Sequence, residues 1–271
     1  MKALLFFLVS TLLLHAEKNL NDLPADLTVP AVSEGEPGPG KRVRLEAGPL
    51  LYLPTDWTAD KRWPVIFEYP GNGGFSNKLG DTSDGTAEGC VMGYGLSAGR
   101  GFIWVSLPFV NADGSEATKW WGDISATKRL CVQTAQNICR DFGGDEKRLI
   151  LAGFSRGAIA CNYIGLHDDE IASLWCGMIC HSHYDGVREG WPYPEADRAS
   201  AIKRLRRLGE RPQWISQEQT IEPTRKWLTS TGISGNWTFE PLPFRNHTGR
   251  WTLCPIESRL KARQWLRELT R

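Results

Sequence analysis

The sequence predicts an α/β fold in which a mainly parallel sheet lies between two layers of helices. Segments with the apolar pattern of strands alternate with segments of helical periodicity along most of the chain. The length, 271 residues, suits one large domain with a sizeable core. No internal repeat is evident. We therefore expect an irregular lead-in over residues 17–40 and a single domain over residues 41–271.

The first part of this domain is expected to be rich in strands. Residues 42–53 have the pattern of two edge strands broken by a Gly-Pro pair, and residues 64–69 have that of a buried strand. Residues 101–107, with Phe-Ile-Trp-Val at their centre, predict another strand. Between these strands, residues 75–95 are rich in Gly, Ser and Asp. We expect them to form a long loop beside the ligand pocket.

The second part alternates regularly between the two kinds of segment. Residues 124–142 place apolar side chains at near-helical spacing, and the Gly-Gly pair that follows is typical of a helix end. We expect further strands at residues 148–153, 171–180, 213–216 and 237–242, and further helices at residues 158–166, 196–208, 223–228 and 256–269. Such an alternation predicts a parallel sheet covered on both faces.

Residues 1–16 have the pattern of a signal peptide. Lys2 precedes an apolar run over residues 3–14, and Ala16 marks the expected cleavage site. The run is shorter than the ~20 residues that a membrane-spanning helix needs. We therefore expect a secreted or periplasmic protein that has no membrane contact after the signal peptide is removed.

The overall charge argues against a nucleic-acid partner. The formal net charge is +1, and charged residues are spread along the chain rather than gathered in a basic patch. We expect a small-molecule or polymeric partner instead, and no cofactor.

The cysteines leave several pairings open. An exported chain with seven cysteines could hold one or two disulfides, and the odd count leaves at least one free thiol. No Cys-x-x-Cys pair occurs, which argues against a zinc knuckle. Cys161, Cys176 and Cys180 lie in apolar surroundings, where a buried thiol is the expected state.

One motif points directly to catalysis. Residues 153–157 read G-F-S-R-G and connect an apolar strand to a segment of small residues with helical character. This G-x-S-x-G pattern in a strand-turn-helix context is typical of a nucleophilic serine. The glycines fit a turn so sharp that a Cβ on either side would clash. We therefore expect Ser155 to be the nucleophile, at a helix N-terminus where the helix dipole favours negative charge.

With this motif in that context, the chain resembles the α/β-hydrolase superfamily, and most of all its secreted esterase branches, which include polyester, feruloyl and acetyl ester hydrolases. The resemblance covers residues 42–271. It is specific for the three-layer α/β-hydrolase fold and for the nucleophile, and unspecific for the substrate.

His247 is the expected general base, because histidine is the side chain that takes a serine proton at neutral pH. It lies in F-R-N-H-T-G over residues 244–249, after the last expected strand and before the closing helix, where the superfamily places its base. His167 follows the nucleophile too closely to reach back over the sheet.

The resemblance also implies two backbone donors for the oxyanion of the reaction intermediate. One is the amide of Arg156, next to the nucleophile. The other follows the strand over residues 64–69, where many relatives have His-Gly but polyester hydrolases have Pro-Gly and then the donor. The sequence Pro-Gly-Asn-Gly over residues 70–73 implies Asn72, with Gly73 as the alternative.

The acid that orients the histidine is less well defined. The customary Gly-x-x-Asp is missing after the strand over residues 213–216, where the chain reads Q-E-Q-T-I-E. Glu218 leaves this strand directly and is our first choice. Glu222 and Asp185 are the alternatives. Asp185 follows the preceding expected strand, where some relatives carry the acid.

Aromatic and histidine residues near the expected strand ends are candidates for substrate binding. Trp120 and Trp121 follow a polar loop, and their faces could stack on sugars or on aromatic acyl groups. The run H-S-H-Y-D over residues 181–185 resembles the start of a metal site, but Gly186 follows and no second histidine cluster completes it. We expect His183 to lie at the pocket rim, and no metal to be bound.

The sequence thus predicts a secreted serine esterase that works through an acyl-enzyme, with carbohydrate-linked acyl or feruloyl esters among its candidate substrates. Two alternatives remain open. The first is a catalytically silent protein of the same fold that binds carbohydrate or a surface, which the missing Gly-x-x-Asp favours. The second is a serine peptidase, which the lack of a preceding gating domain disfavours.

Overall fold

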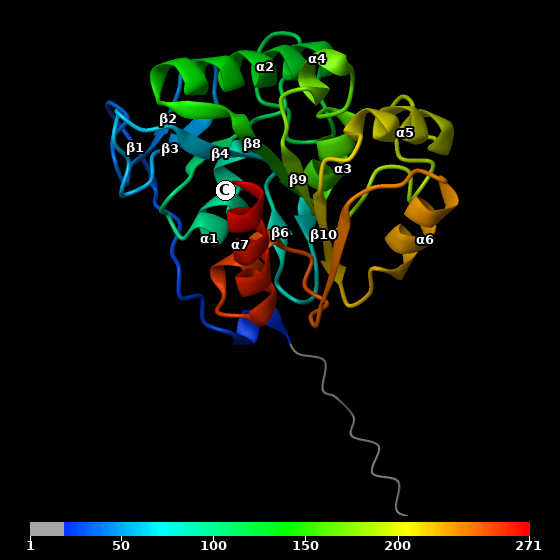
Figure 1. Ribbon diagram of the computed structural model, residues 1–271. Coiled ribbons are helices and arrows are strands. Elements are labelled where there is room, and N and C mark those ends of the chain that lie inside the picture. Colours follow the sequence, from blue (N-terminus) through cyan, green and yellow to red (C-terminus); the bar gives the residue numbers. More distant parts are fainter. Residues whose placement is uncertain (1–18) are drawn as a thin grey trace, which may run out of the picture.

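The structure, a computed structural model, describes residues 19–271. The expected signal peptide over residues 1–16 lies outside the described residues. A nine-stranded sheet runs through the molecule in the order β1-β2-β3-β7-β4-β8-β9-β10-β11 (Figure 1). Its strands are β1 (Val32–Ser33), β2 (Arg42–Arg44), β3 (Leu50–Tyr52), β4 (Trp63–Tyr69), β7 (Ile103–Ser106), β8 (Gly144–Phe154), β9 (Gly177–His181), β10 (Gln213–Glu218) and β11 (Trp237–Leu242).

The strands on the β11 side of β3 are parallel, and β3 is antiparallel to both of its neighbours. All residues of β4, β7 and β9 are buried. Strands buried on both faces are expected where helices cover both sides of a parallel sheet. The arrangement therefore confirms the predicted three-layer α/β fold.

Helices on the two faces enclose separate apolar cores. One core contains residues of α2 (Ile124–Asp141), α3 (Arg156–Tyr163), α5 (Arg198–Leu205) and α6 (Glu222–Ser230). The other contains residues of α1 (Met92–Ser97) and α7 (Glu257–Leu269). In Figure 1, α2 and α4 (Asp169–Ala172) lie above the sheet and α1 and α7 lie below it. Short 3-10 turns lie at Leu20–Asp22, Ala87–Gly89, Arg206–Leu208 and Gly249–Leu253.

The strand expected over residues 171–180 is wrong in its first half. Helix α4 occupies Asp169–Ala172, and β9 begins only at Gly177. The side chain of Asp168 accepts a hydrogen bond from the amide of Ile171 and so caps α4. Acidic residues in its first turn favour the helix further, through the helix dipole.

The expectation of a long loop over residues 75–95 also needs correction. It contains a small hairpin of β5 (Phe75–Ser76) and β6 (Thr82–Ser83), and α1 begins within it. The buried carboxylate of Glu68, on β4, accepts hydrogen bonds from the amides of Val91, Met92 and Gly93. The helix is therefore capped by a residue distant in the sequence, which no local pattern reveals.

The lead-in over residues 17–40 is not wholly irregular, because β1 pairs in parallel with β2. All seven cysteines fall within the described residues, and all are free thiols. Between residues 19 and 271, no helix has the length and apolar character needed to cross a bilayer.

Candidate active site

Ser155 lies at a sharp turn between a strand and a helix. Strand β8 ends at Phe154, and α3 begins at Arg156. Ser155 adopts φ 54° and ψ −114°, a backbone conformation that is unfavourable for a residue with a side chain. Its amide donates to the carbonyl of His181 on the neighbouring strand, at 2.9 Å. Such strain is typical of a functional turn.

The two glycines of the turn are required by close backbone contacts. A Cβ on Gly153 would lie 2.1 Å from the carbonyl oxygen of Gly157. A Cβ on Gly157 would lie 2.1 Å from the carbonyl oxygen of Tyr69, at the end of β4. Any larger residue at either position would force strand and helix apart.

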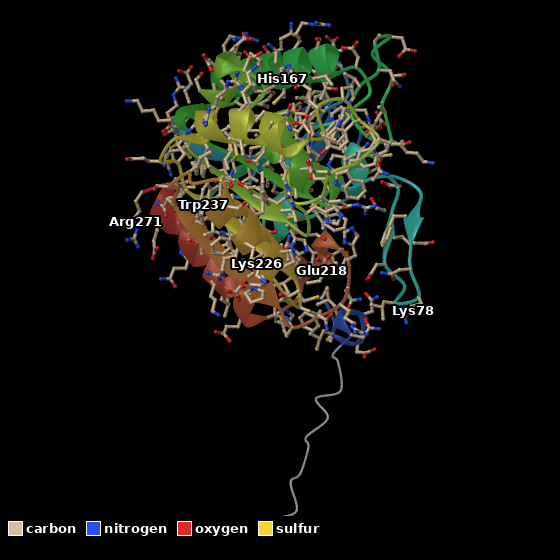
Figure 2. The ribbon with its side chains drawn as sticks, turned by 90° about the vertical axis from the view of Figure 1, so that its right-hand side faces the viewer. Lys78, His167, Glu218, Lys226, Trp237 and Arg271 are labelled. Carbon is tan, nitrogen blue, oxygen red and sulfur yellow. The ribbon has the colours of Figure 1, made fainter. Side chains whose placement is uncertain are left out.

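Three side chains from distant parts of the chain form a hydrogen-bonded line. The Oγ atom of Ser155 lies 2.9 Å from Nε2 of His247, and Nδ1 of His247 lies 2.8 Å from Oε1 of Glu218. Glu218 is the last residue of β10 and His247 follows β11, the adjacent parallel strand. Because both strands end at the same edge of the sheet as β8, the three groups meet there. Figure 2 shows Glu218 at this edge, well away from His167.

Glu218 is held in its ionised form. Burial alone would raise its pKa, but hydrogen bonds from His247 and Ser182, together with the positive charge that His181 and His247 carry when protonated, outweigh this effect and lower the pKa to about 2. A carboxylate at this place keeps the Nδ1–H tautomer of His247, so that Nε2 can accept the proton of Ser155.

The loop that carries His247 is fixed from several sides. The buried carboxylate of Asp81 accepts hydrogen bonds from the amide of His247 and from the side chain of Asn246, both at 2.9 Å. The rings of Phe75 and Phe154 each lie 4.8 Å from the imidazole, measured between centroids. The hairpin β5–β6 therefore positions the histidine.

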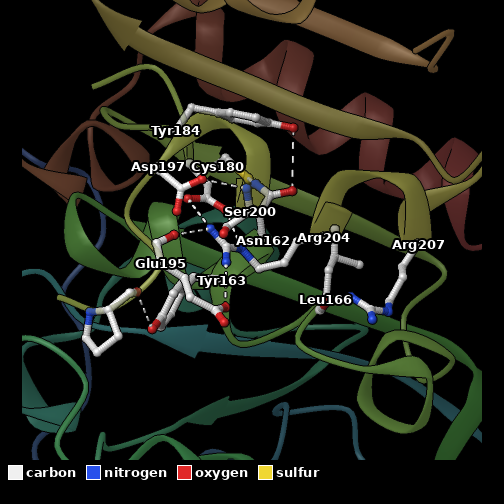
Figure 3. Close-up of polar contacts among 12 residues, drawn as sticks. Asn162, Tyr163, Leu166, Cys180, Tyr184, Glu195, Asp197, Ser200, Arg204 and Arg207 are labelled. Carbon is white, nitrogen blue, oxygen red and sulfur yellow. Dashed lines mark hydrogen bonds and ion pairs between the residues drawn. The ribbon is translucent and has the colours of Figure 1, made fainter. Parts of the chain in front are cut away.

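The alternative acids lie elsewhere. Asp185 is buried and paired with Arg204, whose Nε lies 2.8 Å from Oδ2. Figure 3 shows Arg204 among polar groups that include Glu195, whose backbone carbonyl it also contacts. Glu222 is exposed at the start of α6 and lies 3.8 Å from Arg225. Of the three candidates, only Glu218 contacts His247.

A cavity of about 480 Å³ opens beside Ser155. Trp120, Trp191 and His183 form one wall, with the two tryptophan ring centroids 5.2 Å apart and His183 stacked on Trp191 at 5.7 Å. The complete lining is Asn72, Gly73, Gly74, Phe75, Ser83, Trp120, Ser155, Arg156, Ile159, His183, Trp191 and His247.

Trp121 does not reach this cavity, contrary to expectation. Its side chain is 2 % exposed and stacks on Tyr163 at 4.8 Å. Trp191 takes part in the wall instead. Sequence reasoning missed Trp191, because it lies between strands in a segment with no recognisable pattern.

Both expected oxyanion donors line the cavity. The alternative donor Gly73 is already engaged, since its amide donates to the carbonyl of Thr118 at 2.7 Å. The side-chain oxygen of Asn72 accepts from the amide of Trp120 at 2.8 Å, which fixes the loop. The geometry therefore favours the Asn72 amide over that of Gly73.

The side chain of Arg156 braces the same region from beneath. Its guanidinium donates to the carbonyls of Gly85, Ala117 and Trp120 and lies 4.1 Å from the ring centroid of Phe109. Burial lowers its pKa to about 9. Arg156 thus links the turn at Ser155 to the loop that bears Trp120.

The histidines of the H-S-H-Y-D run have different surroundings. His181 is fully buried, with Nδ1 3.0 Å from Oγ of Ser216 and Nε2 3.1 Å from the carbonyl of Thr248. Burial lowers its pKa to about 4, so it is neutral at pH 7. His183 lines the cavity. Within residues 19–271, no group of three or more metal-binding side chains gathers.

No family model matches the sequence, and a search of curated proteins found no match. Solved structures do resemble it. A thermostable esterase has a TM-score of 0.50 at 15 % identity, over 82 % of this chain and 59 % of that one. A Bacillus cereus carboxylesterase has a TM-score of 0.51 at 13 % identity, over 82 % of this chain and 94 % of that one. Dipeptidyl peptidase 4 from Porphyromonas gingivalis has a TM-score of 0.52 at 13 % identity, over 84 % of this chain and 35 % of that one.

These likenesses, together with the sheet order, show that the chain has the α/β-hydrolase fold. The chain spans under two thirds of the length of the thermostable esterase and about a third of that of the peptidase. A shared fold does not define the reaction, which has to be argued from the site itself.

Proposed function

We propose that the protein is a serine hydrolase that cleaves carboxylic esters through an acyl-enzyme. The observation that carries this proposal is the line of hydrogen bonds from Ser155 through His247 to Glu218 at the wall of an open cavity. Nucleophile, base and orienting acid in this order are the groups that acyl transfer needs.

In the proposed reaction, Nε2 of His247 takes the hydroxyl proton of Ser155 while Oγ attacks the ester carbonyl carbon. The amides of Asn72 and Arg156 would hold the oxyanion of the tetrahedral intermediate. His247 then gives its proton to the leaving alcohol, and the acyl group stays on Ser155. Water, activated by His247, attacks the acyl-enzyme and releases the acid.

Carbohydrate-linked acyl or feruloyl esters suit the cavity best. The rings of Trp120 and Trp191, tilted by 58° to each other, line the cavity with aromatic surface, and aromatic rings pack well against sugar rings and aromatic acyl groups. A volume of about 480 Å³ admits an ester of that size. Secretion or a periplasmic location, proposed from residues 1–16, would place the enzyme where such exported esters occur.

A serine peptidase is the second candidate. The likeness to dipeptidyl peptidase 4 favours it, since that enzyme shares the fold. A silent binding protein is less well supported, because Glu218 supplies the acid that the missing Gly-x-x-Asp left in doubt.

The test uses a fluorophosphonate probe, a nitrophenyl acetate and a dipeptidyl nitroanilide. We expect the probe to label the wild type and Ser230→Ala, an exposed control, but not Ser155→Ala. We expect hydrolysis of the acetate and no cleavage of the nitroanilide. Cleavage of the nitroanilide alone would favour the peptidase, and an unlabelled wild type would favour the binding protein.

A panel of acetyl, feruloyl, glucuronoyl and polyester substrates then tests the substrate class. We expect the highest kcat/KM for a feruloyl or sugar-linked ester, and a drop for Trp191→Ala that is larger for that ester than for nitrophenyl acetate. Equal drops for both substrates would contradict a stacking role of the tryptophan wall.

A further inference from the structure

A fourth polar side chain contacts the catalytic line. The hydroxyl of Ser182 lies 2.5 Å from Oε1 of Glu218 and 2.7 Å from Nδ1 of His247. The latter two atoms are themselves 2.8 Å apart, so the three polar atoms form a closed triangle. Ser182 is 6 % exposed, and the lining of the cavity described above does not include it. It can affect the reaction only through its two partners.

The protons available fit one arrangement. An ionised carboxylate only accepts, while a hydroxyl both donates and accepts. Ser182 therefore donates its proton to Glu218 and offers a lone pair to the Nδ1–H of His247, which it shares with the carboxylate. The imidazole plane is then fixed by two acceptors rather than one, with Nε2 directed at Ser155.

The backbone of Ser182 is unfavourable for a serine. Its φ is 85°, a region in which glycine is at ease and other residues are strained. Its amide donates to the carbonyl of Ser216 on β10 at 2.7 Å, which holds the residue in this conformation directly after β9. Since glycine would suit the backbone better, the hydroxyl is the feature that a serine adds here.

We propose that Ser182 is a positioning residue that locks Glu218 and His247 into their reactive orientation. This inference rests on the proposed function. It predicts that removing the hydroxyl slows turnover without weakening substrate binding, because the group touches the acid and the base but not the cavity.

Two variants separate this role from a structural one. Ser182→Ala removes the hydroxyl and keeps the strain, whereas Ser182→Gly removes both. Ala98→Gly is the matched control, because Ala98 also has a positive φ, 54°, but lies at the end of α1. We expect Ser182→Gly to melt at or near the wild-type temperature, and Ala98→Gly to keep full activity.

The measurements are kcat and KM for nitrophenyl acetate and the rate of fluorophosphonate labelling, all well below each melting temperature. We expect kcat and the labelling rate to fall about 10- to 100-fold in both Ser182 variants, as for a lost hydrogen bond to a charged group, with KM unchanged. Wild-type kcat in Ser182→Gly, or a rise in KM alone, would overturn the proposal.

A spectroscopic measurement does not depend on activity. The Nδ1–H proton of His247 should give a downfield NMR resonance that moves in Ser182→Gly and stays in Ala98→Gly. An unmoved resonance would overturn the role of Ser182. If the wild type neither hydrolyses the ester nor takes the label, the proposed function fails, and this resonance still decides the contact.

Discussion

Glu218 and Asp185 are both largely buried carboxylates at the ends of neighbouring strands, yet their partners give them different roles. Asp185 forms an ion pair with the buried guanidinium of Arg204, so its carboxylate serves a structural role. Glu218 faces an imidazole and a hydroxyl, neither of which carries a permanent charge. Its carboxylate is therefore available for the imidazolium that would form in the proposed reaction.

From this difference we expect Glu218→Gln to lose about 10⁴ in kcat, the size of the corresponding Asp→Asn change in a well-studied triad. The amide cannot hold His247 as a carboxylate does. Glu222→Gln, at an exposed site, should keep wild-type activity. Steady-state kinetics on nitrophenyl acetate check both, and a fully active Glu218→Gln would show that the acid lies elsewhere.

Among the single residues of the site, those that belong to local sequence patterns could be predicted. Ser155 has its motif, and His247 has its place after the last strand. Ser182 and Trp191 could not be predicted, because Ser182 acts through contacts between separate strands and Trp191 through a wall assembled from separate loops. Trp121 is excluded from the cavity because it is buried in the core. The sequence does not distinguish it in this respect from its neighbour Trp120.

Among the elements, the turn between β8 and α3 is the most tightly constrained. Its two glycines are in contact with backbone on both sides, so the turn tolerates no added atom at either position. The hairpin β5–β6 works differently. It holds the His247 loop through Asp81 and contributes Phe75 to the cavity, while its tip, at Lys78, projects from the body of the molecule (Figure 2).

Gly157→Ala should therefore be destabilising, by about 1–3 kcal/mol or more in the free energy of unfolding, because overpacking against backbone cannot relax easily. Gly38→Ala is the control, since a Cβ there would meet only the side chain of Lys41 at 3.7 Å. Urea unfolding of both variants checks this. Equal midpoints would contradict the close packing of the turn.

Asp81→Ala should loosen the His247 loop. It removes hydrogen bonds to a charged group at the amide of His247 and at Asn246, each worth about 1.5–3 kcal/mol. We expect a lower melting temperature and a fall in kcat, whereas Lys78→Ala at the exposed tip should change neither. Retention of full kcat by Asp81→Ala would mean that the hairpin does not position the base.

Element prediction succeeded where a segment has a clear helical period, as in α2, or a short continuous apolar run, as in β4. It failed for α4, where a capped single turn precedes a strand, and for α1, whose cap is the distant side chain of Glu68. Local patterns cannot report a stabilising partner that the fold brings from elsewhere.

For the whole molecule, the polar site lies at the carboxyl edge of the sheet that separates the two apolar cores. His181 lies there, buried beside Trp251 and Phe154. Its Nε2–H donates to a carbonyl and its Nδ1 accepts from Ser216, which fixes one neutral tautomer. Glu218 and His247 are the titratable groups whose charges act on it.

This gives the stability a definite pH dependence. The pKa of His181 falls from about 6.5 to about 4 on folding, so the unfolded chain binds the extra proton between these values. The contribution to stability is complete above pH 6.5 and is lost as the pH falls toward 4, by about 3 kcal/mol. The unfolding free energy of the wild type should exceed that of His181→Gln at pH 7, and this difference should narrow as the pH falls toward 4. A constant difference from pH 7 to 4 would contradict this.

The paired indole rings of Trp120 and Trp191 have a practical consequence. Indole emission responds to the water around the ring, and a ligand in the cavity would displace that water. Substrate analogues and product acids could therefore be titrated on the unlabelled protein by its intrinsic fluorescence. Because ten other tryptophans add a constant background, the difference spectrum that remains in Trp191→Phe would show how much of the signal each ring supplies.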